Sequence, residues 1–233
     1  NFPESIEALQ RARRIGAIEE KEAQSIGSAL HTAMGFLNIE KKQNNEAQKS
    51  FAHALKENIN FIPAVTALSK IYISQGNNKK ALNLLTRVWK SNPHPDIANA
   101  LKLLWNDPRS SMTISKLIDL TEEDASSEAR LFIASEALSA GLTGEAEGQL
   151  NKITDNDYDA FYYQLKSRIA EKNNNPNEVS FALEKAFSAP RKHSWNCNNC
   201  GLTSESWHSK CVNCNSIGTL KWQTPPEIAK MKS

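Results

Sequence analysis

All four cysteines of this chain lie close to its C-terminal end, in two Cys-x-x-Cys pairs separated by ten residues. The pairs are Cys197/Cys200 and Cys211/Cys214. Each pair places two thiols on one tight turn, and two such turns facing each other form a tetrahedral cage of thiolates. Gly201 follows the first pair directly, where a metal-binding turn needs a residue that adopts positive φ. The spacing predicts a metal site with these four cysteines as ligands.

Zinc is the predicted occupant of this cage, and iron is the alternative. Zinc would act as a structural clip for a segment too small to hold a core, whereas iron would make a rubredoxin-like electron carrier. Two disulfides or free buried thiols are the other interpretation, but the long helical remainder of the chain does not need a disulfide staple. His193 and His208 are expected to be surface residues, because four cysteines already complete a ligand set.

Three tryptophans flank the cysteine pairs and are expected to form a small core for this ribbon. They are Trp195, Trp207 and Trp222. The ribbon is predicted to contain three short strands, around Trp195, around Trp207 and at residues 219–222.

The composition limits the functional classes that the chain can belong to. Its 233 residues suffice for one domain of ordinary size and a small module. A net charge of +2, from 28 basic and 26 acidic residues, lacks the strong basic excess of a nucleic-acid-binding domain, so no nucleic-acid partner is expected. The sequence contains no apolar run long enough to span a bilayer and no signal-peptide pattern. Because the chain begins at Asn1 rather than methionine, we interpret it as a fragment or a processed chain.

The elements that must position the ribbon are helical repeats. Residues 61–94 fit a tetratricopeptide (TPR) repeat, which is a pair of antiparallel helices in 34 residues. Leu68 and Ser69 occupy the first helix crossing, Ala81 occupies the second, and Pro93 ends the unit. A polar turn around Gly76 separates the two helices.

The same pattern recurs at the repeat period. A shift of 34 residues toward the N-terminus brings Met34 and Gly35 to the first crossing, with Ala47, Phe51 and Ala54 in the second helix. Further helical hairpins are predicted at residues 127–153 and 158–187, and a helix–turn–helix segment out of strict register precedes them.

The predicted fold class is therefore all-α: a TPR-like α-α superhelix, or solenoid, that ends in a small rubredoxin-like zinc ribbon. The expected divisions are an N-terminal helical cap at 1–26, repeats at 27–190, the ribbon at 191–224 and a tail at 225–233. Because a solenoid needs caps, the ribbon is expected to close the C-terminal helix pair through Trp195 or Trp222.

A solenoid presents a concave surface lined by the first helix of each repeat. Thr32, Phe36, Thr66 and Lys70 are candidate protein-binding residues by their position in the repeat, and Phe36 can alternatively be an interhelix contact. The sequence has no phosphate-binding glycine loop, no His-Glu-x-x-His motif and no Gly-x-Ser-x-Gly motif. The prediction is a protein without enzymatic activity that binds one or more protein partners in the groove.

The order of these features resembles the HemY-type TPR membrane proteins of bacteria, in the form that ends in a C-terminal ribbon. The matching stretches lie at 60–101, 128–150, 182–201 and 219–226. The most specific parts are the Trp-x-x-x-Pro-His-Pro element at 89–95 and the Ala-Pro-Arg at 189–191.

This resemblance implies an upstream membrane anchor absent from this chain, a location on the cytoplasmic side of the bacterial inner membrane, and an association with heme metabolism. It does not imply the flavin-dependent oxidase that shares the name, since no flavin-binding motif is present. Many members of the family lack the cysteines, so the metal is not a general property of the family.

A second resemblance is to TPR proteins with a rubredoxin-like ribbon that regulate lipopolysaccharide and envelope assembly. The first interpretation is thus a scaffold associated with heme metabolism and closed by structural zinc. The alternatives are the envelope regulator and an iron-binding redox protein.

Overall fold

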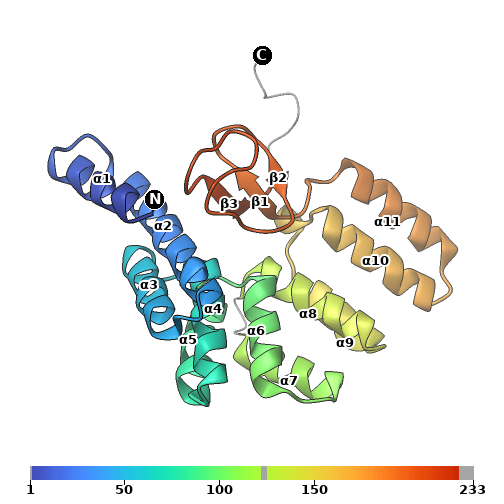
Figure 1. Cartoon of the computed structure of the whole chain (residues 1–233). Helices are drawn as coiled ribbons and strands as arrows, with labels where there is room; N and C mark the ends of the chain where they lie inside the picture. The colour runs from blue at the N-terminus through green and yellow to red at the C-terminus, as the bar shows by residue number, and fades with distance from the viewer. Residues whose placement is uncertain (1, 122–124, 226–233) are drawn as a thin grey trace. The chain divides into compact units, whose positions relative to one another are not determined.

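The computed structural model describes residues 2–121 and 125–225, and the expected tail falls outside these residues except for its first position (Figure 1). The described chain is predominantly helical and ends in a small sheet. The N-terminal helices are α1 (Phe2–Arg14), α2 (Glu20–Glu40), α3 (Asn44–Glu57), α4 (Ile62–Ser74) and α5 (Asn78–Ser91). They are followed by α6 (Pro95–Trp105), α7 (Ser110–Leu120), α8 (Ser127–Ser139), α9 (Thr143–Leu150), α10 (Ala160–Lys172) and α11 (Pro176–Ser188). A 3-10 turn, η1 (Asp155–Asp157), precedes α10, and the strands are β1 (Ser194–Cys197), β2 (Thr203–Ser204) and β3 (Leu220–Gln223).

The chain divides into two compact units, and the boundary falls inside α5. One unit contains residues 1–84 together with residues 193–233, and the other contains residues 85–192. The ribbon therefore belongs to the N-terminal unit. Within this unit its apolar side chains pack on helices near the start of the chain, and closure of the C-terminal helix pair by the ribbon stays a prediction.

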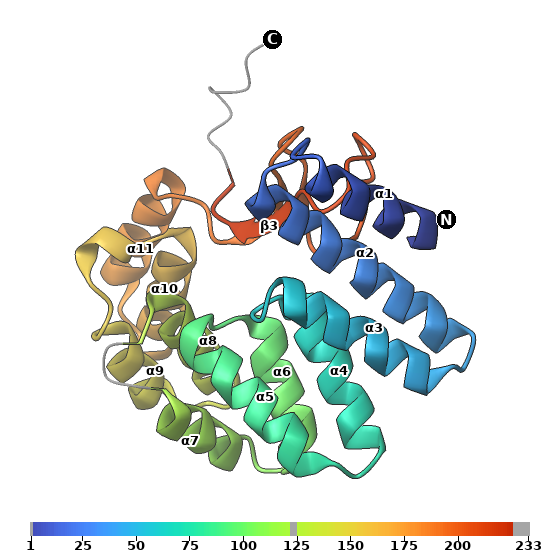
Figure 2. The ribbon, with the colours of Figure 1, turned by 90° about the vertical axis from the view of Figure 1, so that its left-hand side faces the viewer.

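In the first unit, α2 and α3 form an antiparallel hairpin that packs tightly because a glycine faces an aromatic ring. A Cβ atom on Gly35 of α2 would lie 2.5 Å from the ring of Phe51 of α3. Phe51 is fully buried, and Ala47 and Ala54 on the same face of α3 are buried with it. Helices α2 and α3 lie side by side (Figure 2). Gly35 and the alanines predicted along α3 thus lie between the two helices, where they let the helices approach.

The second unit continues the pattern of helical hairpins, with α8 packed on α9 and α10 packed on α11. Ile133 of α8, Leu150 of α9 and Leu165 of α10 are all fully buried. Each hairpin buries one stripe of each helix against a neighbour, which is the packing principle of repeat proteins.

The Trp-x-x-x-Pro-His-Pro element begins the second unit, and its residues have structural roles. Trp89 is buried, and its indole Nε1 donates to Thr121 Oγ1 at 3.0 Å. His94 is the N-cap of α6, where its Nδ1 accepts a hydrogen bond of 3.0 Å from the backbone amide of Asp96. Pro95 then occupies the first helical position, where its missing N–H costs nothing.

The predicted fold class is confirmed: the chain is a mostly helical TPR-like solenoid with a cysteine cluster at its C-terminal end. Among residues 2–121 and 125–225, no helix combines the length and the apolar character that crossing a bilayer requires.

A pair of glycine-to-alanine substitutions tests the close packing of α2 on α3. Gly35→Ala should lower the free energy of unfolding by about 1–2 kcal/mol, because the new methyl group meets the Phe51 ring. Gly148→Ala in α9 meets no atom within 4 Å and is the matched control. It should raise the stability by about 0.5–1 kcal/mol through helix propensity alone. Urea denaturation followed by circular dichroism measures both; equal effects would contradict the described packing.

The buried His94 predicts a pH dependence of stability. Burial lowers its pKa to about 3, so the unfolded chain takes up a proton at mildly acidic pH that the folded chain does not. The contribution of His94 to the free energy of unfolding is therefore fully present above the ordinary histidine pKa of about 6.5. It decreases as the pH falls toward the lowered pKa of His94 in the folded chain. Acidification from about pH 7 to about pH 4.5 should lower the free energy of unfolding by about 2 kcal/mol through His94 alone.

The comparison variant is His94→Asn, which retains an N-capping acceptor but cannot titrate in this range. It should be less stable than the wild type at neutral pH and should lose less stability on acidification. Urea denaturation at both pH values measures this, and identical losses for the two proteins would rule out His94 as the titrating group.

Candidate functional site

The ribbon is an antiparallel sheet of three short strands with β1 in the centre. Trp195 of β1 pairs with Ser204 of β2 on one side and with Trp222 of β3 on the other. The first and last strands are where the sequence predicts them. The middle strand is at Thr203–Ser204 and not around Trp207, because the chain turns away from the sheet after Ser204.

A buried asparagine joins the three strands. Asn196 is fully buried, and its Nδ2 donates to Ser194 O at 2.8 Å, Ser194 Oγ at 3.1 Å and Gln223 O at 2.8 Å. Its Oδ1 accepts a hydrogen bond of 2.8 Å from Thr203 Oγ1. The amide nitrogen and oxygen of this side chain are both hydrogen-bonded, and they link β1 to β2 and β3 directly before the first cysteine.

The two cysteine pairs lie on turns of the same backbone geometry. Gly201 donates its amide to Cys197 O at 2.8 Å, and Asn215 donates its amide to Cys211 O at 2.9 Å. The residue after each pair has positive φ, +74° at Gly201 and +61° at Asn215. The requirement predicted for Gly201 is confirmed, and asparagine meets the same requirement in the second turn because it tolerates this region better than most residues.

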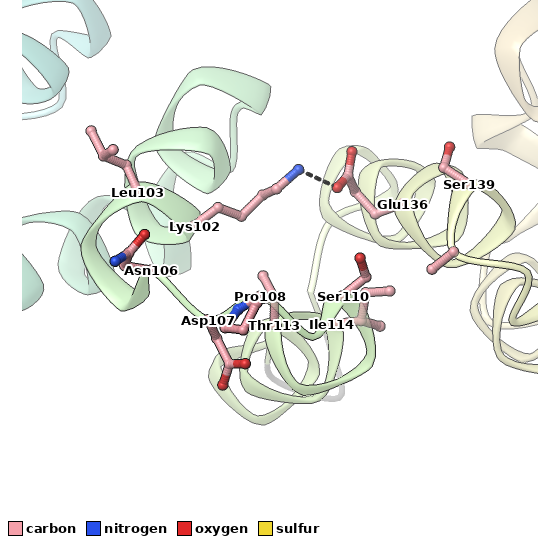
Figure 3. Close-up of a pocket in the computed structure, with 11 residues that line it drawn as sticks. Lys102, Leu103, Asn106, Asp107, Pro108, Ser110, Thr113, Ile114, Glu136 and Ser139 are labelled. Atoms are coloured by element: carbon pink, nitrogen blue, oxygen red, sulfur yellow. Dashed lines mark hydrogen bonds and ion pairs between the residues drawn. The ribbon is translucent and has the colours of Figure 1, made fainter.

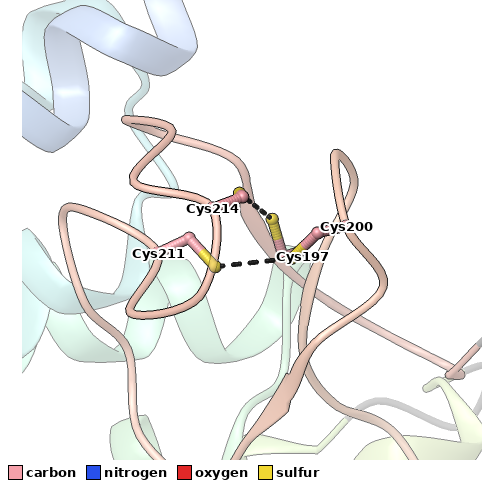
Figure 4. Close-up of side chains that lie close together, drawn as sticks. All are labelled: Cys197, Cys200, Cys211 and Cys214. Carbon is pink, nitrogen blue, oxygen red and sulfur yellow. Dashed lines mark hydrogen bonds between the residues drawn. The ribbon is translucent and has the colours of Figure 1, made fainter.

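The four sulfur atoms come together between these turns (Figure 4). The distance from Cys197 Sγ to Cys214 Sγ is 3.7 Å, that from Cys200 Sγ to Cys211 Sγ is 3.6 Å, and all four ligand atoms lie within 4.8 Å of one another. A disulfide would require about 2.05 Å, so neither close pair is one. A tetrahedron with metal–sulfur bonds of about 2.3 Å has edges of about 3.8 Å, which matches the observed spacing. The donor set therefore fits a four-thiolate metal site.

Hydrogen bonds around the sulfurs favour the thiolate at some cysteines and not at others. The side chains of Ser216 and Asn199 and the backbone amide of Ser216 lower the pKa of Cys214 to about 5. A backbone hydrogen bond from Cys214 also lowers the pKa of Cys211, but burial and the neighbouring thiols outweigh it and raise that pKa to about 11. A bound cation would stabilise the Cys211 thiolate, since metal binding releases thiol protons.

The three tryptophans separate into two groups. Trp195 and Trp222 face each other across β1 and β3 with ring centroids 5.5 Å apart, as expected for a ribbon core. Trp207 instead lies edge-on to Phe61, at the start of α4, with centroids 5.4 Å apart. The expectation that all three form the ribbon core is therefore wrong for Trp207, because its ring packs on the helices.

The second unit contains a groove of ≈ 670 Å³ (Figure 3). Lys102 of α6 reaches across it to form an ion pair with Glu136 of α8, and the two residues are 34 positions apart. Leu103, Pro108 and Ile114 contribute apolar surface. This groove is not among the sites predicted from the sequence. The sequence does hold a signal for it: Lys102 and Glu136 have opposite charges and are one repeat period apart, on the first helices of consecutive hairpins.

The four candidate protein-binding residues lie in the first unit and differ in accessibility. Thr32 is fully buried, so its side chain does not reach a surface. Phe36 is 39% exposed and lies edge-on to Phe51, so its ring is partly accessible at the surface and also forms an interhelix contact. Thr66 is half-buried and donates to Ile62 O of its own helix, whereas Lys70 is exposed.

Comparison with protein families identifies one segment of the chain. Residues 38–104, which run from the end of α2 to the end of α6, match the model of the tetratricopeptide repeat family. These residues are tetratricopeptide repeats. The match covers both helices of the 61–94 repeat that the sequence pattern predicts.

A curated relative is described as the probable magnetosome protein Mms48 of Magnetospirillum gryphiswaldense. It is 22% identical over 165 residues, which cover 70% of this chain and 37% of the relative. The chain thus spans little more than a third of that relative's length.

Several solved structures are similar to this chain at low identity. YrrB, a TPR protein with an unusual peptide-binding site, is 17% identical, with a TM-score of 0.39 over 68% of this chain and 84% of YrrB. PilF of Pseudomonas aeruginosa is 11% identical, with a TM-score of 0.38 over 80% of this chain and 91% of PilF. A TPR protein of Parabacteroides merdae is 18% identical, with a TM-score of 0.36 over 81% of this chain and 93% of that protein.

Three substitutions in the ribbon test the cysteine site as a graded series. Cys200→Ser should strongly weaken zinc binding, because only three of the four thiolates remain. Asn196→Ala should weaken zinc binding about 10–100-fold, because it removes the hydrogen bonds that orient β1 beside the first ligand. Asn213→Ala changes an exposed asparagine between the second pair of cysteines and should bind zinc normally. Zinc titration against a competing chelator measures the affinities.

Circular dichroism should retain most of the helical signal in all three variants, since the helices are built from other residues. Unchanged zinc affinity in Cys200→Ser would contradict the four-cysteine site. An equal loss of affinity in Asn196→Ala and Asn213→Ala would contradict the positioning role of Asn196.

Proposed function

We propose that this chain is a non-enzymatic protein-interaction scaffold that binds a segment of a partner protein in the groove between α6 and α8. The observation that carries the proposal is the groove itself, together with its place in the fold. It lies between the first helices of two consecutive hairpins and is crossed by the Lys102–Glu136 ion pair. TPR repeats are units for binding other proteins, and residues 38–104 match that family.

The chemistry of the groove suits an extended polypeptide with an acidic group. The side chains of Lys102 and Glu136 remain 36% and 28% exposed. A partly exposed ion pair of this kind contributes only about 0–1 kcal/mol, so it can be opened at low cost. A carboxylate of the partner can then replace Glu136 on Lys102, while Leu103 and Ile114 contact apolar side chains.

The proposal assigns a structural metal ion to the ribbon, with Cys197, Cys200, Cys211 and Cys214 as its ligands. The sulfur spacing supports a tetrahedral site and suits zinc and iron equally. We propose zinc, because the ribbon is too small to fold around its own core and zinc commonly stabilises such segments.

The cellular setting rests on the resemblance to the HemY-type proteins. We propose that the scaffold works at the cytoplasmic face of the bacterial inner membrane, held there by an upstream anchor, and that its partners belong to heme metabolism. The proposed parts of the chain are an N-terminal cap at 1–26, the repeats at 27–190, the ribbon at 191–224 and a tail at 225–233.

Charge reversal in the groove tests the scaffold. The protein would be crosslinked in its own cells as wild type, as Lys102→Glu and as Lys172→Glu, which makes the same change at an exposed position of α10. Lys102→Glu should lose most of the partner captured by the wild type, because like charges then face each other across the groove. Lys172→Glu should retain it, and quantitative mass spectrometry of the crosslinked proteins gives the ratio.

Equal capture by all three proteins would rule out the groove as the binding site. If the partner is lost on charge reversal but is not an enzyme of heme metabolism, the scaffold stands and the heme association falls. Capture of envelope-assembly proteins would favour the second resemblance.

A further inference from the structure

The ribbon lies beside the N-terminal helices (Figure 2). It contacts them through polar and apolar groups. Ser25 Oγ of α2 donates to Gly218 O at 2.9 Å, and Lys221 of β3 hydrogen-bonds to the same hydroxyl group. Trp207 lies edge-on to Phe61. Ile217 packs against an apolar cluster formed by Leu9, Ala23 and Leu30. These contacts join segments that are almost the whole chain apart in sequence.

The contact at Gly218 is a close approach of backbone to backbone. A Cβ atom at this position would lie 2.8 Å from Ser25 O and 3.0 Å from Ile26 Cα. Gly218 also has a φ of +68°, which favours glycine. Since backbone atoms cannot move aside as a flexible side chain can, the ribbon fits α2 only when this turn has its described shape.

The docking residues of the ribbon flank the second cysteine pair. Trp207 precedes Cys211 by four residues, and Ile217 follows Cys214 by three. A β-bridge between Lys210 and Ile217 closes the turn that contains both cysteines. The turn that supplies two of the four sulfur atoms therefore also sets the positions of the side chains that touch the helices.

The ribbon has little else to maintain this shape. Its buried residues are Trp195, Asn196, Cys197, Cys211, Gly218 and Leu220, and two of these six are sulfur ligands of the proposed site. Segments of this size rarely fold without a metal ion or a disulfide. Where metal ligands form such a share of the core, the free energy of metal binding is largely the free energy of folding.

We propose that metal occupancy of the ribbon controls its docking on the N-terminal helices, so that removing the metal releases α1 and the first half of α2. The inference rests on the metal site of the proposed function and adds a regulatory consequence to it. With the metal bound, Ile217, Gly218 and Trp207 cover the apolar surface at Leu9, Ile26 and Phe61. Without it, that surface is exposed. Because coupling between sites is reciprocal, weaker docking must also weaken metal binding.

Hydrogen–deuterium exchange of the whole chain, loaded with zinc and after treatment with a chelator, tests the coupling. Removing zinc should speed exchange in α1 and the first half of α2 about tenfold, within the range typical of allosteric coupling. Exchange in α10 and α11 should not change, which makes these helices an internal control. Mass spectrometry of the intact protein gives the zinc content of each sample.

A substitution on the helix side of the contact tests docking without altering the ribbon. Ser25→Arg places a bulky cation where Gly218 and Lys221 approach α2, and arginine is a good helix former. Gln24→Arg makes the same change in charge at the neighbouring exposed position and is the matched control. Ser25→Arg should show fast exchange in α1 and α2 even with zinc bound, and about tenfold weaker zinc affinity. Gln24→Arg should behave as the wild type.

The outcomes separate the inference from the function on which it rests. If the wild type binds zinc but removing the metal leaves exchange in α1 and α2 unchanged, the coupling is overturned and the metal site stands. If Ser25→Arg binds zinc as tightly as Gln24→Arg, the coupling is likewise overturned. If the wild type binds neither zinc nor iron, the metal site and the coupling both fall. The chelation experiment needs no variant, so it decides the matter even if Ser25→Arg does not fold.

Discussion

Each helical hairpin of this chain can bury its apolar stripe only against the elements next to it, and the rest of the structure depends on this constraint. The contact between Gly35 and Phe51 shows how it operates, because α2 and α3 approach closely enough that a single methyl group does not fit. A repeat array distributes its stability over many such local contacts and has no single central core. The apolar faces at the end of an array must therefore be covered by something other than another repeat.

In the N-terminal unit, the cysteine ribbon covers part of such a face. Its Ile217 joins the cluster around Leu9 and Leu30, and its Trp207 contacts Phe61. The ribbon is the C-terminal part of the chain, yet it completes the packing of the first helices. The segment that carries the four cysteines thus covers apolar surface formed by the opposite end of the sequence.

The site residues divide according to how local their geometry is. The cysteine cage depends on two tight turns, each set by a Cys-x-x-Cys pair and a following residue with positive φ. Sequence spacing alone therefore predicts that the four sulfurs come together. The groove at Lys102 and Glu136 depends on the rotation of α6 against α8, because their side chains meet only if both helices present the same face. The rotation of a helix about its axis also decides which of its residues are accessible, and Thr32, selected by its position in the repeat, is buried.

The sequence by itself determined the helical hairpins, their 34-residue period and the cysteine cage, because helix periodicity, turn residues and ligand spacing act within a few tens of residues. Only the tertiary structure decided which helices the ribbon packs on, that Trp207 belongs to the helical interface, and where the groove lies. Ser25 and Gly218 are 193 residues apart, and no local pattern constrains a contact over that distance. The ribbon follows the C-terminal helices in the chain, yet its Gly218 closely approaches the backbone of α2 and its Ile217 packs against the cluster around Leu9.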